Sequence, residues 1–243
     1  MDIGLRDTQE DCLLIDGQIV QERRVGIVKG RIGSAEILLA VCDGMGGHSG
    51  GEWASRFVCE RLKDFRRTSR FLREATLAKL REIQHELEEE GMASGGSTLA
   101  CVEMKNNAAN IYNIGDSRVY KLTERDISVL SHDHSLVQSM VDKGYLSNDE
   151  GRRHPYRNVL EFGLGGVFAK QWRTPGRDTY SCEDVLNEGE YCLLCSDGVC
   201  NSLTDNEMHD LLIPDPFGRL NEFVVRLREG MHDNASLILI GNE

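Results

Sequence analysis

Long apolar runs and an excess of basic charge are both missing from this chain of 243 residues. Without a stretch of about 18 consecutive apolar residues, we expect no transmembrane helix. The first residues, 1–11, are charged and contain no apolar core, so we expect no signal peptide. Basic residues number 28 against 40 acidic ones, and the net charge of −12 argues against nucleic acid or an anionic membrane as partner.

Internal repeats, low-complexity tracts and linkers are also missing. Hydrophobic residues make up 40% of the chain and charged residues 28%, which is typical of a globular protein with an ordinary core. The length suits one sizeable domain. We therefore expect a single domain over residues 1–243.

The eight cysteines favour free thiols. Cys42, Cys101, Cys192 and Cys195 lie inside apolar runs, where cysteine behaves as a small hydrophobic residue. The spacing of Cys192, Cys195 and Cys200 also allows a zinc site, but the first two lie on opposite faces of one predicted strand. A reducing cytoplasm is the better interpretation.

Predicted strands and helices come in separate batches, which favours an α+β fold. Asp16-Gly17 between two apolar runs predicts a tight hairpin. Residues 95–131 read as sequential strands with short turns, which predicts an antiparallel meander. Thr204 and Glu207 form the pattern of a capping box, so a helix should begin at Thr204. Helical spacing also predicts helices over residues 52–62, 77–91 and 219–230.

Residues 145–177 form a polar segment that is rich in glycine and arginine and only weakly periodic. Such a segment is the best candidate for a mobile flap over a site.

Three acidic residues stand where apolar runs end or begin. Asp43 ends the run 38–42 and is followed by Gly44, while Asp197 lies in LLCSDG and Asp233 in HDNASLILI. Carboxylates are hard ligands that select Mg²⁺ or Mn²⁺ over zinc. Three of them at one point would repel strongly without a cation, and two divalent ions about 3.5–4 Å apart would neutralise them. The alternative is that each aspartate only caps a turn.

Arg6, Glu10 and Asp11 form a second group just before the first predicted strand. An arginine there could grip a phosphate with its planar donors, and the two carboxylates could hold metal-bound waters. The alternative is a charged N-terminal surface. His48 could act as a general acid or phosphate ligand, or only as a hydrogen-bonding loop residue.

Other motifs give weaker evidence for a functional site. His132 and His134 could be metal ligands, but a polar turn is favoured. The glycines from 44 to 51 match neither the dinucleotide fingerprint nor the phosphate loop that ends in GK[ST]. No GxSxG nucleophile motif and no convincing Cys-His pair is present.

Several of these motifs occur together and in order: RDTQED, VCDGMGGHSGGEWAS, GGSTL, NIGDSRVY, HSLVQSMVDKG, HPYRNVL, LLCSDGV and HDNASLIL. In this the chain resembles the metal-dependent serine/threonine protein phosphatases of the protein phosphatase 2C type, and in particular the short bacterial members. The resemblance implies a β-sandwich of two antiparallel sheets flanked by helices on both faces. It also implies a metal pair in a cleft at one end of the sandwich.

The resemblance further implies a metal site for two Mn²⁺ or Mg²⁺ ions, built from Glu10, Asp11, Asp43, Gly44, Asp116, Asp197 and Asp233. Asp43 would bridge the ions, and Gly44 would contribute its carbonyl. Asp116 and Asp197 would serve a weaker third ion. Arg6 would orient the substrate phosphate, and residues 136–177 would be the variable flap.

The chain departs from the family pattern at three places. Met45 stands where animal members carry a histidine proposed as general acid. Asn201 stands where an aspartate often helps to hold the third ion, and a neutral ligand should weaken that site. Residues 161–166 read EFGLGG, so the flap contacts should be unusual.

The resemblance thus predicts hydrolysis of phosphoserine and phosphothreonine in proteins by a water that bridges two divalent ions. Phosphorylated proteins are the expected partners, a serine/threonine kinase the expected counterpart, and a monomer the expected state. Two alternatives stay open, a phosphatase-like binding module without catalysis and a hydrolase for small phosphoesters.

Overall fold

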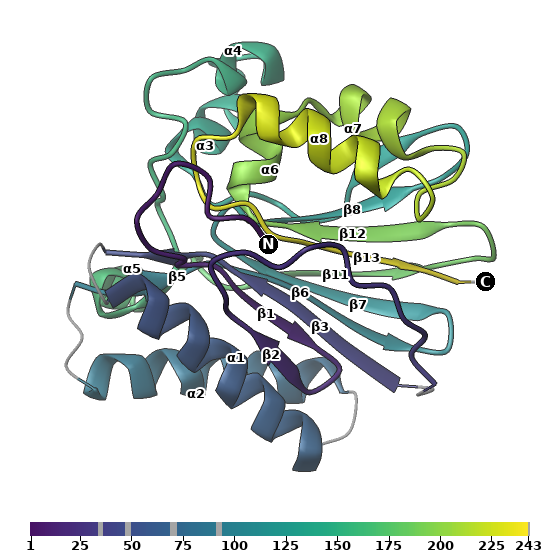
Figure 1. The fold of residues 1–243 in the computed structure, drawn as a ribbon. Helices are drawn as coiled ribbons and strands as arrows, with labels where there is room; N and C mark the ends of the chain where they lie inside the picture. Colours follow the sequence, from purple (N-terminus) through teal and green to yellow (C-terminus); the bar gives the residue numbers. More distant parts are fainter. Residues whose placement is uncertain (34–35, 47–49, 69–71, 91–93, 243) are drawn as a thin grey trace.

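A computed structural model describes residues 1–33, 36–46, 50–68, 72–90 and 94–242. Two antiparallel sheets pack face to face, and helices cover the outer face of each sheet (Figure 1). The predicted α+β sandwich is therefore confirmed.

The first sheet has six strands in the order β11-β7-β6-β3-β1-β2. Their bounds are β1 Cys12–Ile15, β2 Gln18–Val20, β3 Glu36–Cys42, β6 Leu99–Lys105, β7 Ala108–Ile114 and β11 Tyr180–Val185. The second sheet has four strands in the order β13-β12-β8-β9. Their bounds are β8 Arg118–Leu122, β9 Ile127–Val129, β12 Tyr191–Cys195 and β13 Leu237–Gly241.

A third, small sheet lies beside the sandwich and was not expected from the sequence. It pairs three strands of two residues each, which are β4 Gly44–Met45, β5 Gly96–Ser97 and β10 Leu164–Gly165. Such short pairings carry no alternation of apolar and polar residues.

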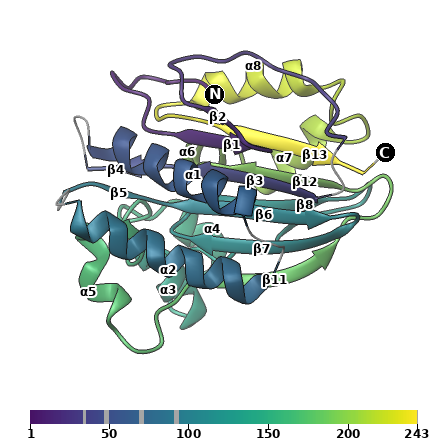
Figure 2. The ribbon, with the colours of Figure 1, turned by 90° about the horizontal axis from the view of Figure 1, so that it is seen from below.

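Helices form the two outer layers. The first sheet is covered by α1 Gly50–Thr68 and α2 Arg73–Glu89, seen from below in Figure 2. The second sheet is covered by α6 Asp197–Ser202, α7 Asp205–Leu212 and α8 Leu220–Gly230. None of the described helices is both long and apolar enough to cross a membrane.

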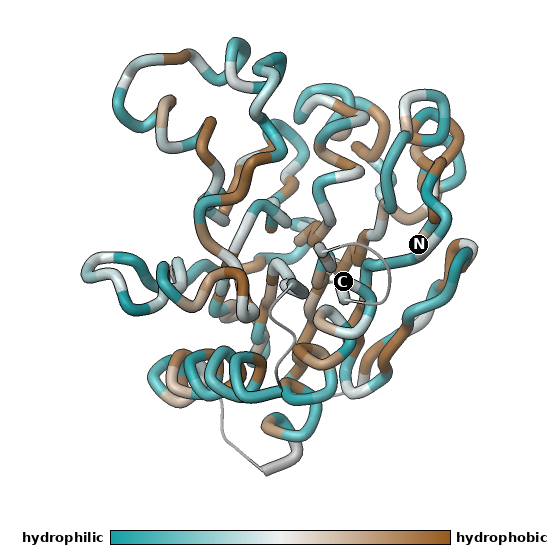
Figure 3. The backbone as a smooth tube through the Cα atoms, turned by 90° about the vertical axis from the view of Figure 1, so that its left-hand side faces the viewer, coloured by the Kyte–Doolittle hydropathy of each residue, from teal (hydrophilic) through white to brown (hydrophobic). Residues whose placement is uncertain are grey.

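Among the described residues, three apolar clusters hold these layers together. One fills the space between the two sheets, with Leu39, Val102 and Leu194 among its buried members. The other two lie between each sheet and its helices. Figure 3 views the molecule from the end at which β3 ends, and its apolar segments gather toward the middle while polar segments follow the outer loops.

Two local predictions are confirmed. Asp16 and Gly17 adopt positive φ values of 44° and 87° and connect β1 to β2 as a hairpin. Thr204 caps α7, since its side chain accepts from the N–H of Glu207 and the Glu207 side chain accepts from the N–H of Thr204. These signals are reliable because they act over a few residues.

The predicted meander is wrong at one place. β6 and β7 pair in the first sheet, but β8 belongs to the second sheet, where it pairs with β12 and β9. The chain crosses from one sheet to the other at Gly115, whose φ is +90°. A Cβ atom at Gly115 would lie 2.7 Å from the Thr98 side chain, so only glycine fits this crossing.

Residues 136–177 contain much regular structure. They form α3 Leu136–Asp142, α4 Asn148–Arg152, β10, the 3₁₀ helix Gly166–Phe168 and α5 Ala169–Trp172. A polar stretch with helices this short leaves little periodicity in the sequence. The mobility of this flap stays a prediction.

Candidate metal centre

The register of the first sheet brings two of the predicted ligands together. Cys12 on β1 is paired with Cys42 on β3. In an antiparallel pair the residue before Cys12 lies opposite the residue after Cys42. Asp11 and Asp43 are therefore cross-strand neighbours at the end of this sheet.

The second sheet delivers three more carboxylates at the same end. Cys195 at the end of β12 is paired with Arg118 at the start of β8 and with Leu237 at the start of β13. Asp197 follows the end of β12, while Asp116 and Asp233 precede the two neighbouring strands. Three chain segments far apart in sequence thus meet at one edge.

The electrostatics of these carboxyl groups show that they are neighbours. Burial, and then the charges of Asp11, Asp197 and Asp116, raise the pKa of Asp43 well above its usual range. Asp43 and Asp197 also affect each other's pKa, so the two carboxyl groups lie close together. Burial together with Asp197 likewise raises the pKa of Asp116. Carboxylates that disfavour one another's charge in this way are typical of a cation site.

The backbone of Asp43 is held by two other motifs. Its N–H donates to Thr98 Oγ1 at 3.0 Å, and its carbonyl accepts from the Thr98 N–H at 2.8 Å. The Thr98 hydroxyl is in turn 2.6 Å from Ser117 Oγ. The GGSTL and GDSR motifs therefore position Asp43 rather than contributing their hydroxyl groups to the site.

Asp11 is completely buried, and its two carboxylate oxygens differ in their hydrogen bonding. Its Oδ2 accepts a hydrogen bond from Ser196 Oγ at 2.9 Å, whereas its Oδ1 is buried and has no hydrogen-bond partner among the described residues. Burial raises the pKa of Asp11 to about 7. A buried carboxylate oxygen without a donor fits a site whose remaining partner is a cation or its water.

Close backbone approach explains the glycine that follows Asp43. Gly44 donates its N–H to the Glu10 carbonyl at 3.1 Å. A Cβ atom at Gly44 would lie 2.1 Å from the Gly51 carbonyl oxygen and 2.7 Å from that of Glu10. Any other residue would push the start of α1 and the N-terminal segment apart.

Arg6 lies at the rim of this cluster and pairs with Asp233. Its Nη2 is 2.5 Å from Asp233 Oδ2, and its side chain is 57% exposed. Within the described part of the chain, no three His, Cys, Asp or Glu side chains converge as a finished metal cage. Asp43 and Asp197 lie close together, while Asp233 is paired with Arg6. The donors are all oxygens and suit Mg²⁺ or Mn²⁺.

Three histidines were candidates for the site. His132 is partly exposed and its Nε2 lies 3.0 Å from Asp142 Oδ2. His134 Nδ1 accepts from the Gly115 N–H at 3.1 Å, so the favoured polar turn describes both residues better than a metal site. His48 lies outside the described residues. Asn201 Nδ2 donates to Asp197 Oδ2 at 3.0 Å, so it does reach the predicted third-ion side of the cluster.

A pocket of about 370 Å³ adjoins the carboxylates and runs beneath the flap helices α3 and α4. Its lining includes Asp116, Asp197 and Cys200. Arg118 also lines it and makes a bidentate contact with Asp133, at 3.0 and 2.7 Å. Sequence reasoning missed this arginine and its partner, although the GDSR motif contained the signal.

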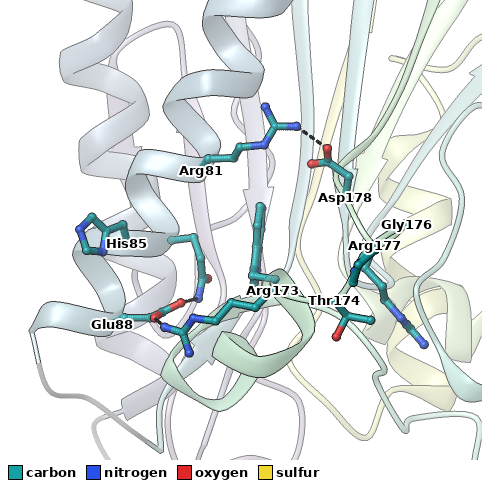
Figure 4. Close-up of a pocket in the computed structure, with 11 residues that line it drawn as sticks. Arg81, His85, Glu88, Arg173, Thr174, Gly176, Arg177 and Asp178 are labelled. Carbon is teal, nitrogen blue, oxygen red and sulfur yellow. Dashed lines mark hydrogen bonds and ion pairs between the residues drawn. The ribbon is translucent and has the colours of Figure 1, made fainter.

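A second pocket, of about 460 Å³, lies between the C-terminal half of α2 and residues 172–178 (Figure 4). Ion pairs link its two walls, from Arg81 to Asp178 and from Arg173 to Glu88. None of the predicted site residues lines it. Its charges are already paired, so the carboxylate cluster is the better functional site.

Comparison with known proteins gives the family. The family model described as "Protein phosphatase 2C" matches residues 28–233. The serine/threonine phosphatase stp of Listeria monocytogenes is 33% identical over 186 residues, which cover 72% of this chain and 71% of stp. The serine/threonine protein phosphatase PstP of Mycobacterium tuberculosis is 28% identical over 214 residues, which cover 83% of this chain but only 40% of PstP.

Solved structures show the same fold. The serine/threonine phosphatase Stp1 from Staphylococcus aureus superimposes with a TM-score of 0.78 at 27% identity, covering 100% of this chain and 98% of Stp1. The catalytic domain of a PstP phosphatase, solved in complex with two manganese ions, gives a TM-score of 0.71 at 24% identity, with 98% and 93% covered. The predicted family is therefore confirmed, and the chain belongs to the protein phosphatase 2C family.

Proposed function

We propose that this chain removes phosphate from phosphoserine and phosphothreonine in proteins, using two Mn²⁺ or Mg²⁺ ions held by its carboxylate cluster. The observation that supports this most strongly is the convergence of Asp11 and Asp43 from one sheet with Asp116, Asp197 and Asp233 from the other. The PstP catalytic domain that binds two manganese ions shares this fold.

Asp43, Asp197 and Asp233 would hold the ion pair together with the Gly44 carbonyl, and Asp43 would bridge it. Glu10 and Asp11 would hold water in the coordination shell, and Asp116 with Asp197 would serve a weaker third ion. Bound divalent ions would acidify a water molecule and neutralise charge on the phosphoryl oxygens.

The protein's own contribution to the substrate is Arg6. Among the described residues, Arg6 donates through Nη2 to Asp233 and through no other nitrogen, which leaves further guanidinium N–H donors for a phosphate. Its position at the exposed rim lets a phosphorylated side chain enter from solvent. His48, outside the described residues, is the candidate that returns a proton to the serine or threonine oxygen.

Substrates and context follow from the relatives, which are serine/threonine phosphatases by name. The substrates would be proteins phosphorylated by a serine/threonine kinase whose signalling this enzyme reverses. A cytoplasmic location agrees with the eight free thiols, and the enzyme would act as a monomer.

The test is release of phosphate from a phosphothreonine peptide with and without Mn²⁺. We expect Mn²⁺-dependent release that Asp43→Asn abolishes and Asp126→Asn leaves intact, because Asp126 lies in an exposed turn between β8 and β9. No release with Mn²⁺ would favour a binding module. Efficient turnover of small phosphoesters alone would favour a hydrolase for small phosphoesters.

A further inference from the structure

Two thiols bracket the junction of β12 and α6, at which Asp197 lies. Cys195 is the last residue of β12, and Cys200 lies in α6. Their Sγ atoms are 3.4 Å apart. Both belong to the apolar cluster between the second sheet and its helices, where the Tyr120 hydroxyl donates to Cys200 Sγ at 3.4 Å. The two sulfur atoms therefore face one another across the start of α6.

Only one of the two thiols can be reached from the pocket beside the carboxylates. Cys200 lines the pocket of about 370 Å³ that is also lined by Asp116 and Asp197. Cys200 is 7% exposed, whereas Cys195 is fully buried behind it. A small neutral oxidant that enters this pocket meets Cys200 first and has Cys195 within reach as the second thiol.

We propose that Cys195 and Cys200 form a reversible disulfide when a hydroperoxide enters this pocket, and that the disulfide weakens the metal centre. The second half of this proposal rests on the proposed role of Asp197 as a metal ligand.

The chemistry balances with hydrogen peroxide as the oxidant. The Cys200 sulfur attacks one peroxide oxygen, an S–O bond forms, the O–O bond breaks, and one water leaves, so that Cys200 becomes a sulfenic acid. The Cys195 sulfur then displaces the hydroxyl group from Cys200, an S–S bond forms, and a second water leaves. Two thiols are oxidised, and one hydrogen peroxide is reduced to two waters.

Closing this bond would tie the end of β12 to α6. A disulfide needs an S–S distance of about 2.05 Å, so the two sulfur atoms must approach by roughly 1.4 Å, and any part of this approach that the side chains do not supply falls on the residues between them. Asp197 lies between them, and so does Ser196, whose hydroxyl holds Asp11 at 2.9 Å. Two predicted ligands are thus attached to the residues that the disulfide would constrain. A misplacement of about 1 Å in an active site can lower the rate by roughly 100-fold.

A second close pair of thiols offers a matched control. Cys42 Sγ and Cys59 Sγ are 3.7 Å apart, and Cys42 directly precedes Asp43. Both are fully buried, and neither lines the pocket that exposes Cys200. If closeness of two sulfur atoms alone decided the reaction, this pair would also oxidise. We expect it to stay reduced.

The experiment treats the reduced, Mn²⁺-loaded protein with hydrogen peroxide, blocks the remaining thiols and maps disulfides by mass spectrometry. Digestion on the N-terminal side of aspartates separates the two cysteines, because Asp197 lies between them. We expect a Cys195–Cys200 link, a loss of phosphatase activity of roughly tenfold or more, and weaker Mn²⁺ binding by titration calorimetry. Dithiothreitol should reverse all three.

Cys200→Ser and Cys195→Ser should keep their activity in peroxide, whereas Cys42→Ser should lose it like the unmodified protein. Absence of the Cys195–Cys200 link overturns the proposal, and this result needs no variant. A link that leaves Mn²⁺ binding and activity unchanged overturns the switch. Inactivity of the reduced protein with Mn²⁺ instead contradicts the proposed function. In that case the disulfide map and the Mn²⁺ titration still show whether the disulfide forms and whether it weakens Mn²⁺ binding.

Discussion

The side-chain carbonyl of Asn234 accepts a hydrogen bond from the backbone N–H of Glu10 at 2.7 Å. The Asn234 amide group donates to the carbonyl oxygens of Ile3 at 3.0 Å and Thr8 at 3.1 Å. One buried side chain therefore fastens three points of the N-terminal segment that carries Arg6. The residue next to Asp233 thus places the predicted phosphate-binding arginine.

Replacing Asn234 by alanine should disturb both stability and the site. Three lost hydrogen bonds at about 1 kcal/mol each predict a loss of about 2–3 kcal/mol in the free energy of unfolding, measured with urea. Weaker Mn²⁺ binding and a higher KM for a phosphopeptide should accompany it. Asn187→Ala, which removes a side-chain contact to Glu190 in an exposed turn, is the control and should change neither. Unchanged kinetics in Asn234→Ala would show that the clamp is purely structural.

Arg6→Ala tests phosphate binding. A charge-assisted hydrogen bond contributes about 1.5–3 kcal/mol, so KM for a phosphopeptide should rise roughly tenfold or more. Stability should change little, because the Arg6–Asp233 ion pair is at the exposed rim. Arg24→Ala, an exposed arginine paired with Asp2, is the matched control. Equal KM values for the two variants would exclude Arg6 as the phosphate ligand.

Thr204→Ala tests the cap of α7. Loss of the capping box should lower the free energy of unfolding by about 1 kcal/mol, because the N–H of Glu207 loses its acceptor. Phosphatase kinetics should stay unchanged, since the cap contacts no predicted ligand. Thr204→Ser keeps the hydroxyl and should restore most of the stability. A Thr204→Ala protein as stable as the parent in urea would contradict this role of the cap.

His134 should make stability depend on pH. Burial lowers the pKa of His134 from 6.5 to about 4. Below pH 6.5 the unfolded chain binds a proton at this residue, whereas the folded protein does not until about pH 4. Stability from this group is therefore fully present above pH 6.5 and is lost as the pH falls toward 4.

The measurement compares urea unfolding at pH 7 and pH 5 for the parent and for His134→Gln. The parent should lose more stability between these pH values than the variant. His85→Gln, which replaces an exposed histidine beside Glu89, should behave like the parent. An identical pH dependence in all three proteins would rule out the buried, neutral state of His134.

Local signals in the sequence predicted much of this fold. The Asp16-Gly17 hairpin and the Thr204 cap are decided by residues within four positions of one another. The pairing of strands depends instead on residues far apart in the sequence. The turn at Gly115 looks like a hairpin in sequence, but contacts with Thr98 and His134 send the chain to the other sheet. Such contacts have no signature in local periodicity.

The site was predictable as a set of residues but not as a geometry. Acidic residues at strand ends indicated Asp43, Asp197 and Asp233, and their shared edge follows from registers that no single motif encodes. The supporting side chains Asn234 and Ser196 were missed. Their partners, Glu10 and Asp11, lie on segments distant in sequence, so their roles appear only in the folded chain.

The most direct test of the carboxylate cluster as a metal centre is anomalous diffraction at the manganese edge from crystals grown in MnCl₂. We expect two peaks about 3.5–4 Å apart, with Asp43 between them and Asp197 and Asp233 as further ligands. No peak among these carboxylates, or manganese bound only elsewhere, would contradict the account.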